Sequence, residues 1–342
     1  MTINDIAREA QVSTATVSRV MNNKAVSTDR KARVEAAIAK LNYVPNRMAR
    51  ALMSKSSHAI GVLTTSMSNQ YYMEITEVIE RRFRDKSYMQ FLCCTDGDQE
   101  RERTYIADLV SRQVDGIIII DPALENIDSG YLKAMAGQVP LVLVHPLAGV
   151  TDIDSVVIDQ QLGMARVMDY LAGLGHIDIG FVGGVVGYSY SLKEDAWRRA
   201  HVEAGRDPAK QLLVHIEDAN TENAVSQTRL ALARLLNSGT VPTALFACND
   251  LMAIGILEAA AEVGLRVPDD LTVIGHDNTF LAAHNKLTSV DLKMKSMGLA
   301  AADLLMHVME GRDSEPRRIL LTPDLVRRET SARPRSEDGT HH

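Results

Sequence analysis

Apolar residues recur at helical spacing in three short segments near the N-terminus. Thr2 and Asp5 form the pattern of a capping box before the first segment, and Ser13 is a candidate N-cap of the second. The third segment begins at Thr28 and ends at Asn42, a residue that tolerates left-handed backbone geometry. About three residues separate the first two segments, a spacing that suits a helix-turn-helix. The positions expected to face the core are Ile3, Ile6, Ala7 and Ala10, then Val17, Val20 and Met21, then Val34, Ile38 and Leu41.

From residue 58 onward, short apolar runs alternate with amphipathic segments. The runs are rich in β-branched residues and lack strict alternation, which is typical of parallel strands buried on both faces. Eight such runs exceed one open sheet, so we expect two doubly wound subdomains. The expected fold is an all-α helix-turn-helix head followed by an α/β body with two parallel sheets. The candidate strands are AIGVLTT (59–65), YMQFLCC (88–94), DGIIIID (115–121), VPLVLV (139–144), DIGFVGG (178–184), LLVHI (212–216), TALFACN (243–249) and DLTVIGH (270–276).

Composition narrows the class of protein. The chain has 342 residues, of which 46% are apolar and 24% charged, as in an ordinary protein of two or three domains. It has no run of about 18 apolar residues, so we expect no membrane span. MTINDIAREA places charges where a signal peptide has its apolar core, so we expect a cytoplasmic protein. The chain has three cysteines, an odd number: Cys93, Cys94 and Cys248. We interpret them as reduced thiols that form no disulfide and bind no metal.

The net charge of −7 is unevenly distributed. Residues 1–57 hold ten Lys and Arg against four Asp and Glu, which gives +6. The rest of the chain holds 27 against 40, which gives −13. A small basic segment on an acidic body favours nucleic acid as a partner, because phosphate binding needs positive charge only on the contacting face. The alternative is a fluctuation of surface composition.

Motifs of enzymes are absent or incomplete. GGVVGYS places glycines after a candidate strand, but the spacing is not that of a dinucleotide loop and no acidic residue ends a strand some 20 residues later. The sequence contains no P-loop, no metal-spaced His/Cys cluster and no G-x-S-x-G motif. We therefore expect no enzymatic activity, no cofactor and no metal ion.

The second helix carries the candidate chemistry of the head. The face opposite its core-facing side carries small hydroxyl side chains and one arginine. Such a face can lie close to a DNA backbone. An arginine can bind guanine O6 and N7 with two hydrogen bonds, worth roughly 1–3 kcal/mol of base discrimination. A solvated helix face is the alternative. The residues of this face are Thr14, Ala15, Ser18, Arg19 and Asn22.

The head resembles that of the lac repressor/galactose repressor (LacI/GalR) family of bacterial regulators. IAREAQVSTATVSRVMNN and VSTDRKARVEAAIAKLNYVPNRMARAL follow the family pattern nearly position by position. Gln11 departs from it, because the family usually has Gly in this turn; a positive φ here would cost glutamine about 1 kcal/mol. The resemblance implies that residues 1–44 bind DNA. The implied base-reading residues are Thr14, Ala15 and Arg19, and the implied backbone contacts are Thr2, Ser13, Ser18, Asn22 and Ser27.

Residues 45–57 resemble the hinge helix and linker of this family. A helix of about seven residues is marginal alone in water. In the family, this segment folds when two subunits pair over the operator. The resemblance implies that Leu52 inserts into the minor groove and kinks the DNA, and that Ala49 lets the paired helices approach closely. The implied contacts of this segment are Asn46, Arg47, Ala49 and Leu52.

The body continues the resemblance, which covers about residues 2–332. LVSRQVDGIII, YLAGLGHIDIGFVGG, LFACNDLMAIGILEAAAEVGLRVPDDLTVIGHDN and LVRRETS carry it. The family's body is similar to periplasmic sugar-binding proteins, in which a ligand lies in a cleft between two subdomains. The implied division is an effector-binding and dimerisation domain at 58–332, with subdomain one at about 58–160 and 291–320, subdomain two at about 161–290 and 321–332, and a disordered tail at 333–342.

Ligands of such folds lie at the carboxyl ends of strands, where loops converge. Residues that match the family's effector positions therefore form the expected binding site. They are Tyr72, His145, Ser189, Lys193, Asn249, Asp277 and Phe280.

Three departures from the family pattern leave the effector open. Lys193 replaces the usual arginine, which keeps the charge and loses the bidentate geometry. His145 stands at the usual strand-end aspartate, and Ala219 replaces an aromatic residue that often stacks on ligand. Loss of a carboxylate with retention of a cation favours an acidic or phosphorylated sugar. A neutral sugar and a nucleoside or purine stay open as alternatives.

The function implied is that of a dimeric transcription regulator that binds a pseudo-palindromic operator, most simply a repressor of a carbohydrate catabolic or uptake operon. A small sugar-like effector would change the angle between the subdomains and so change operator affinity. The alternatives are a regulator that acts with a corepressor and a solute-binding receptor without DNA function. A receptor would need a signal peptide and leaves the basic head unexplained. No leucine heptads follow residue 332, so we do not expect a tetramer formed that way.

Overall fold

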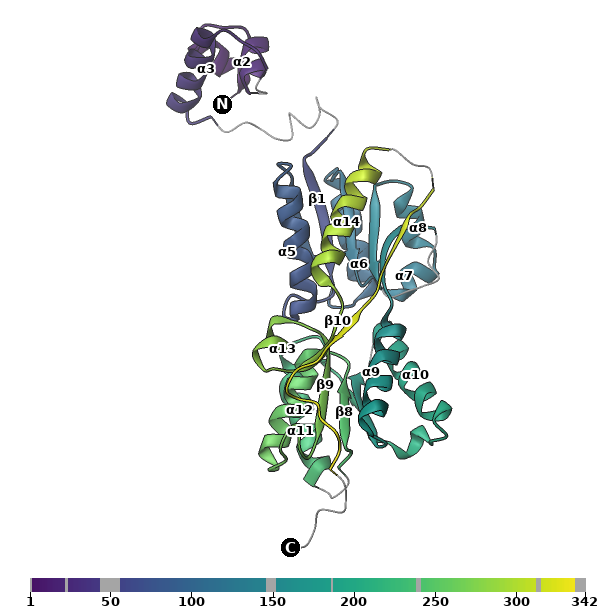
Figure 1. Cartoon of the computed structure of the whole chain (residues 1–342). Coiled ribbons are helices and arrows are strands. Elements are labelled where there is room, and N and C mark those ends of the chain that lie inside the picture. The colour runs from purple at the N-terminus through teal and green to yellow at the C-terminus, as the bar shows by residue number, and fades with distance from the viewer. Residues whose placement is uncertain are drawn as a thin grey trace, which may run out of the picture. The chain divides into compact units, whose positions relative to one another are not determined.

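The computed structural model describes residues 2–21, 24–43, 56–145, 152–185, 187–237, 241–311 and 315–335. Its contacts divide the chain into two compact units, Met1–Ser57 and His58–His342. We call the first unit the head and the second the body; Figure 1 colours them along the chain from purple to yellow.

The described residues of the head form three helices around one small core, as the apolar pattern predicts. The helices are α1 (Ile3–Glu9), α2 (Thr14–Met21) and α3 (Thr28–Lys40). The Oγ of Ser13 accepts a hydrogen bond from the backbone N of Thr16 at 3.2 Å, which confirms the predicted N-cap of α2. The backbone N of Thr2 donates to Asp5 Oδ2 at 2.8 Å, as the capping box requires. The buried core side chains are Ile6, Ala7, Ala10, Val17, Val20, Val34 and Ala37.

Gln11 and Asn42 have left-handed backbone in the described part of the head. Gln11, in the turn between α1 and α2, has φ 50°, and Asn42, after α3, has φ 47°. The turn therefore does require the positive φ that glycine adopts without cost, and Gln11 is strained there. Asn42 is suited to its position, because asparagine tolerates this conformation better than most residues.

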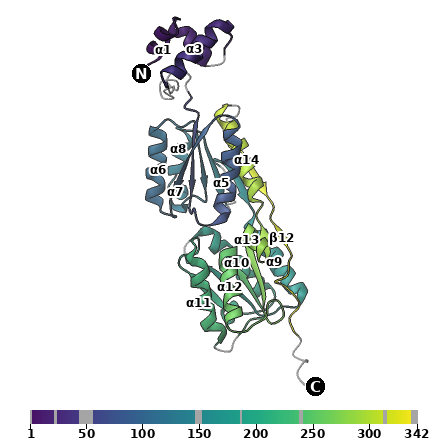
Figure 2. The same cartoon turned by 90° about the vertical axis from the view of Figure 1, so that its left-hand side faces the viewer.

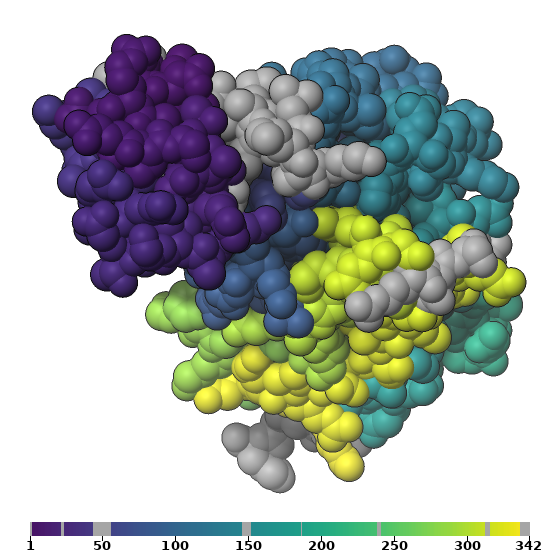
Figure 3. All heavy atoms as spheres, turned by 90° about the horizontal axis from the view of Figure 1, so that it is seen from above, coloured from purple at the N-terminus to yellow at the C-terminus, as the bar shows by residue number. Residues whose placement is uncertain are grey.

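Subdomain one of the body is a six-stranded, fully parallel sheet. Its four inner strands are buried on both faces, whereas the edge strands Met89–Cys94 and Arg318–Leu321 are partly exposed, unlike the expectation for the run 88–94. Alternate residues of a strand point to opposite faces of the sheet: Ile118 and Ile120 pack in the core on one face, and Ile117 and Ile119 in the core on the other. Helices α5 and α14 lie side by side on the first face (Figures 1 and 3, blue and yellow-green). The strands in spatial order are β11 (Arg318–Leu321), β5 (Asp154–Ile158), β4 (Leu141–His145), β3 (Gly116–Ile120), β1 (Ala59–Thr64) and β2 (Met89–Cys94), and the helices are α5 (Gln70–Arg84), α6 (Gln99–Ser111), α7 (Leu124–Asp128), α8 (Tyr131–Ala136) and α14 (Met294–Met309).

Subdomain two repeats this architecture with a second six-stranded sheet, whose edge strand β12 alone runs antiparallel. Helix α9 packs against α10, and α11 against α12, on opposite sides of the sheet in Figure 1. The strands in spatial order are β12 (Asp324–Val326), β10 (Thr288–Asp291), β9 (Thr272–Asp277), β8 (Ala244–Ala247), β6 (Ile179–Gly184) and β7 (Leu213–Ile216), and the helices are α9 (Gln160–Leu174), α10 (Tyr188–Glu203), η1 (Pro208–Lys210), α11 (Asn223–Asn237), α12 (Asp250–Glu262) and α13 (Phe280–His284). The predicted pair of doubly wound sheets is thus confirmed.

The chain crosses between the subdomains three times: after β5 into α9, after β10 into α14, and after β11 into β12. Figure 2 shows α14 and β12, the elements reached by the last two crossings, in different subdomains. Lys293 joins these two crossings, because its Nζ lies 2.9 Å from Asp291 Oδ2 and 2.8 Å from Asp324 Oδ2. Three crossings thus join the subdomains, and Lys293 ties two of them together.

Some parts differ from the sequence expectation. Residues 333–335, expected in a disordered tail, are described, and the guanidinium of Arg335 lies 2.9 Å from Asp270 Oδ1. Among the helices of the described ranges, none combines the length and the apolar character needed to cross a bilayer.

Candidate functional site

The outer face of α2 is built as the sequence predicts. Val17 and Val20 are buried against the other two helices, so α2 is held by one side. Thr14, Ala15 and Arg19 are exposed on the opposite side. A helix presented in this way can enter the major groove, where an arginine reads guanine.

The expected backbone contacts of the head lie at helix ends. Ser27 is exposed at the N-cap position of α3, and Ser13 precedes α2. Ser18 is half-buried on α2, and the Thr2 hydroxyl lies 3.1 Å from Asp5 Oδ2. Helix N-termini suit phosphate oxygens, because their first backbone N–H groups lack helical partners. Five expected DNA contacts lie outside the described residues and stay predictions: Asn22, Asn46, Arg47, Ala49 and Leu52.

In the body, expected effector residues of subdomain one lie at the carboxyl edge of its sheet. Tyr72, on the first turn of α5, donates a hydrogen bond from its hydroxyl to Asp121 Oδ2 at 3.0 Å. Asp121 follows β3, and burial raises the pKa of its carboxyl. His145 is the last residue of the neighbouring strand β4 and is buried. Burial, and then the charge of Arg318, lower the pKa of His145 to about 4, so its ring is neutral at pH 7.

The expected residues of subdomain two lie at the carboxyl edge of the second sheet. Lys193 on α10 is 2% exposed, and its ammonium donates to the backbone O of Cys248 at 2.9 Å. Asn249 is 3% exposed; its Nδ2 donates to the backbone O of Ala219 at 2.7 Å, while its Oδ1 caps α12. Ser189 Oγ donates to Gln160 Oε1 at 2.7 Å. The contacts of Asn249 join the loop after β7 to the end of β8.

Asp277 ends β9 inside this group of polar side chains. Its backbone has φ 111°, a value that non-glycine residues rarely adopt, and its side chain is 5% exposed. Oδ1 lies 3.3 Å from Nδ1 of His276. Burial, and next the charge of Asp250, raise the pKa of Asp277 well above its usual range. A strained, buried carboxyl at a strand end is typical of a ligand-binding position.

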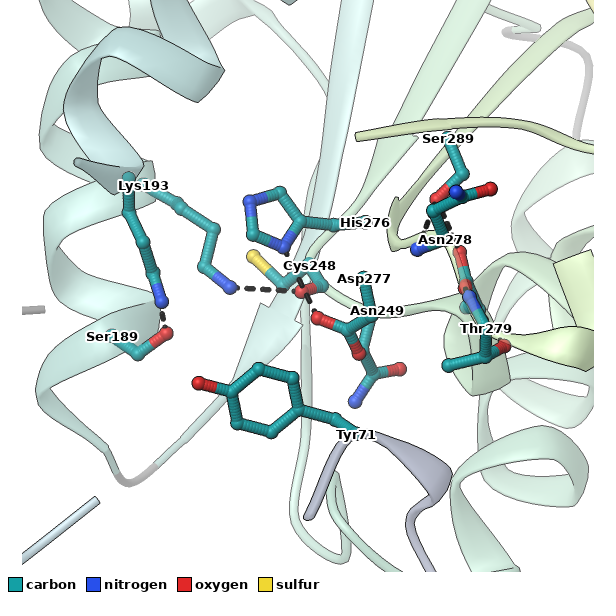
Figure 4. A network of polar contacts seen from close by, with 12 residues as sticks. Tyr71, Ser189, Lys193, Cys248, Asn249, His276, Asp277, Asn278, Thr279 and Ser289 are labelled. Atoms are coloured by element: carbon teal, nitrogen blue, oxygen red, sulfur yellow. Dashed lines mark hydrogen bonds and ion pairs between the residues drawn. The ribbon is translucent and has the colours of Figure 1, made fainter. Parts of the chain in front are cut away.

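We define the interdomain cluster as Tyr71, Tyr72, Asp121, Ser189, Tyr190, Lys193, Asn220, Asn249 and Asp277. Figure 4 shows Lys193, Ser189, Asn249 and Asp277 converging with the ring of Tyr71, which comes from the other subdomain. Phe280 is not part of this cluster: it is 66% exposed at the start of α13, and its ring stacks on His284.

Sequence reasoning missed four members of the cluster. Tyr71 precedes the predicted Tyr72, and its ring meets that of Tyr72 edge-on at 5.0 Å. Asp121 ends a candidate strand, which is the signal that could have identified it. Tyr190 and Asn220 carry no comparable signal, because Tyr190 reads as part of an ordinary helix and Asn220 lies in a loop.

Comparisons with known proteins agree with both halves of this structure. The sequence matches "Bacterial regulatory proteins, lacI family" over residues 2–46 and "Periplasmic binding protein-like domain" over residues 168–331. The chain is 32% identical to the HTH-type transcriptional regulator DegA of Bacillus subtilis, over 97% of this chain and 98% of that protein. It is also 32% identical to the ribose operon repressor of Escherichia coli, over 96% of this chain and 98% of that protein.

A solved structure of the lac repressor dimer bound to operator and the anti-inducer ONPF is similar over the whole chain. The TM-score is 0.85 and the identity 29%, with 97% of this chain and 99% of that chain covered. The similarity includes the head as well as both subdomains of the body.

Proposed function

This chain belongs to the lacI family of bacterial regulatory proteins, and we propose that it is a repressor whose effector is a neutral, hydroxyl-rich molecule of the sugar class. It is a DNA-binding transcriptional regulator with an effector-binding body of the periplasmic-binding-protein type. Repressors of this family bind operator DNA and small-molecule effectors and form dimers.

The face of α2 supports a reading of DNA by Thr14, Ala15 and Arg19. These side chains are exposed, while Val17 and Val20 anchor the helix from behind. In a dimer, two such helices would enter successive major grooves of a pseudo-palindrome. The name of the ribose operon repressor supports a sugar operon as the target.

The charges of the interdomain cluster carry the proposal for the effector. Lys193 is the cation that an acidic sugar would need, but its ammonium already binds the Cys248 carbonyl. Asp121 is half-buried and Asp277 is buried, and burial raises the pKa of both carboxyls, so an anion bound beside them would disfavour their ionised forms still further. Hydroxyl groups suit the cluster better, because carboxyl, amide and tyrosine groups can donate to them or accept from them. These charges therefore weigh against the acidic or phosphorylated sugar.

Isothermal titration of the full-length protein tests the effector class. The panel is ribose, galactose and glucose, the phosphate esters of the same sugars, and adenosine and guanosine. We expect a neutral sugar to bind at least about tenfold more tightly than its phosphate, a difference of about 1.4 kcal/mol. Binding of only the phosphates or only the nucleosides would overturn the proposed class. Operator affinity with and without the bound sugar then distinguishes inducer from corepressor.

We also propose that the protein acts in the cytoplasm, where its operator lies, and that it is not an enzyme. Incubation of the protein with any sugar it binds, followed by NMR of the sugar, tests the second point. An unchanged spectrum is expected, and a new product would contradict it.

A further inference from the structure

Asn220 lies in the loop after β7 and accepts two hydrogen bonds from the opposite subdomain. Its backbone O accepts from Ser66 Oγ at 2.7 Å, and its Oδ1 accepts from Asn69 Nδ2 at 3.2 Å. Ser66 and Asn69 are buried and precede α5 in subdomain one. The two subdomains are therefore joined by direct hydrogen bonds between their own residues.

The same Asn220 is bonded to the interdomain cluster. The hydroxyl of Tyr190 donates to Asn220 Oδ1 at 2.7 Å. The ring of Tyr190 packs on the backbone of Gly184, where a Cβ would lie 2.4 Å from the ring and 2.8 Å from the Ala219 Cβ. Tyr190 thus fills the space beside Ala219, the position at which the resemblance leads us to expect an aromatic residue. Lys193 Nζ lies 5.4 Å from the centre of this ring.

The contacts of Asn220 in subdomain one organise the turn that carries Tyr71 and Tyr72. Ser66 Oγ accepts hydrogen bonds from the backbone N of Ser68 at 3.1 Å and of Asn69 at 3.3 Å. Asn69 Oδ1 caps α5 by accepting from the backbone N of Tyr71 at 3.0 Å. A single residue of subdomain two therefore fixes the start of the helix that brings two tyrosines to the cluster.

We propose that Asn220 is a positioning residue that latches the two subdomains together and, through Tyr190, couples effector binding to their separation. The inference rests on the proposed function, since it assigns a regulatory role within the same site. Tyr190 holds the side-chain amide of Asn220 in the orientation in which it accepts from Asn69. An effector hydroxyl that accepts the hydrogen bond of Tyr190 instead would release this amide and so weaken the latch. A ligand can shift the equilibrium between two arrangements only through such differential contacts.

Hydrogen exchange measured by mass spectrometry on the full-length protein, without DNA or effector, tests the latch. Asn220→Ala removes the side-chain acceptor, so amide exchange in residues 66–72 rises by about tenfold, because the turn before α5 opens more often. The substitution lies in subdomain two, so a rise in subdomain one reports the contact between them. Asn220→Asp keeps the acceptor oxygens and restores exchange to within about twofold of the wild type.

Asn223→Ala is the matched control. Asn223 lies three residues further on, and its Nδ2 donates to Asp218 Oδ2 at 3.3 Å, within its own subdomain. Its loss leaves exchange in residues 66–72 unchanged. Tyr190→Phe removes only the hydroxyl bonded to Asn220 and raises that exchange by a smaller factor, which keeps the test open if Asn220→Ala does not fold.

Exchange in residues 66–72 that is the same in Asn220→Ala as in the wild type would overturn the latch. An equal rise in Asn223→Ala would also overturn it, because the effect would then be general loosening of the loop. Neither result bears on DNA or sugar binding, so the latch and the proposed function fail separately.

Discussion

The ammonium group of Lys193 donates a hydrogen bond to the backbone carbonyl of Cys248, with 2.9 Å between Nζ and O. Both residues are buried, and they lie on different elements, α10 and the end of β8. The sequence suggests that the ammonium of Lys193 could bind an acidic effector, but in the structure this group stabilises the site itself.

Replacement of this lysine should therefore lower stability. Lys193→Met leaves a buried carbonyl without its donor, which costs about 1–3 kcal/mol. Urea unfolding followed by the fluorescence of Trp197, which packs in the same subdomain, measures the loss. Lys210→Met, at an exposed lysine of η1, is the control and should change the free energy of unfolding by less than about 0.5 kcal/mol. Equal stability of both variants would show that the bond contributes nothing.

Arg19 on α2 should determine base preference. With duplexes enriched from a random pool by the wild-type protein, Arg19→Ala should lose about 1–3 kcal/mol of discrimination at one base pair of each half-site. Arg50 lies in the segment that resembles the family's hinge helix, where the resemblance implies a phosphate contact. Arg50→Ala should therefore weaken all duplexes alike and reduce the salt dependence of binding, because phosphate contacts carry no sequence information. Fluorescence anisotropy on matched and singly altered duplexes distinguishes the two. Undiminished discrimination by Arg19→Ala would rule out its role as a base reader.

Gln11→Gly should stabilise the head. Gln11 has φ 50°, and glycine adopts this conformation without the clash of a Cβ, so the gain should be about 1 kcal/mol. Asn42→Gly is the control, because Asn42 has φ 47° and asparagine already tolerates it, so its gain should be smaller. The measurement is urea unfolding followed by far-ultraviolet circular dichroism, evaluated over the part of the unfolding curve in which the head unfolds. A loss of stability in Gln11→Gly would contradict the assignment of strain.

His145 should make the body sensitive to acid. Its folded pKa is about 4, below the usual 6.5, because burial and Arg318 disfavour the charged ring. The unfolded chain therefore binds a proton first as the pH falls. The contribution of His145 is complete above pH 6.5 and is lost towards pH 4, by up to about 3 kcal/mol.

His145→Asn removes this titration, so its stability should fall less steeply between pH 6.5 and pH 4 than that of the wild type. His284→Asn makes the same substitution at an exposed ring and serves as the control. Urea unfolding at half-unit pH steps compares the three proteins. Parallel curves for His145→Asn and the wild type would contradict the assigned burial.

Much of the fold follows from local patterns. Periodicity and capping residues predict the three helices of the head, and buried β-branched runs predict eight of the body's strands. The pattern missed β5, β10, β11 and β12. Three of these have only three or four residues, too few for a recognisable period. Each of the four also pairs with a strand distant in sequence: β5 with β11, and β10 with β12.

The site was predicted unevenly for the same reason. Asn249 caps α12 and Asp277 ends β9, positions that the sequence marks, and the structure brings both together with Lys193 of α10. Asn220 could not be predicted, because its partners Ser66 and Asn69 lie more than 150 residues away and no local pattern encodes such contacts. Phe280, expected among the effector residues, is exposed, and its ring stacks on His284.

The most direct test of the account is whether the full-length protein binds duplex DNA under the control of a small molecule. The measurement is anisotropy of enriched pseudo-palindromic duplexes at low salt, with and without the sugars, sugar phosphates and nucleosides of the panel. We predict specific binding that at least one neutral sugar changes by a factor of about 5–150, the range of coupling between two sites. Failure to bind any duplex, with and without these molecules, would contradict the central claim.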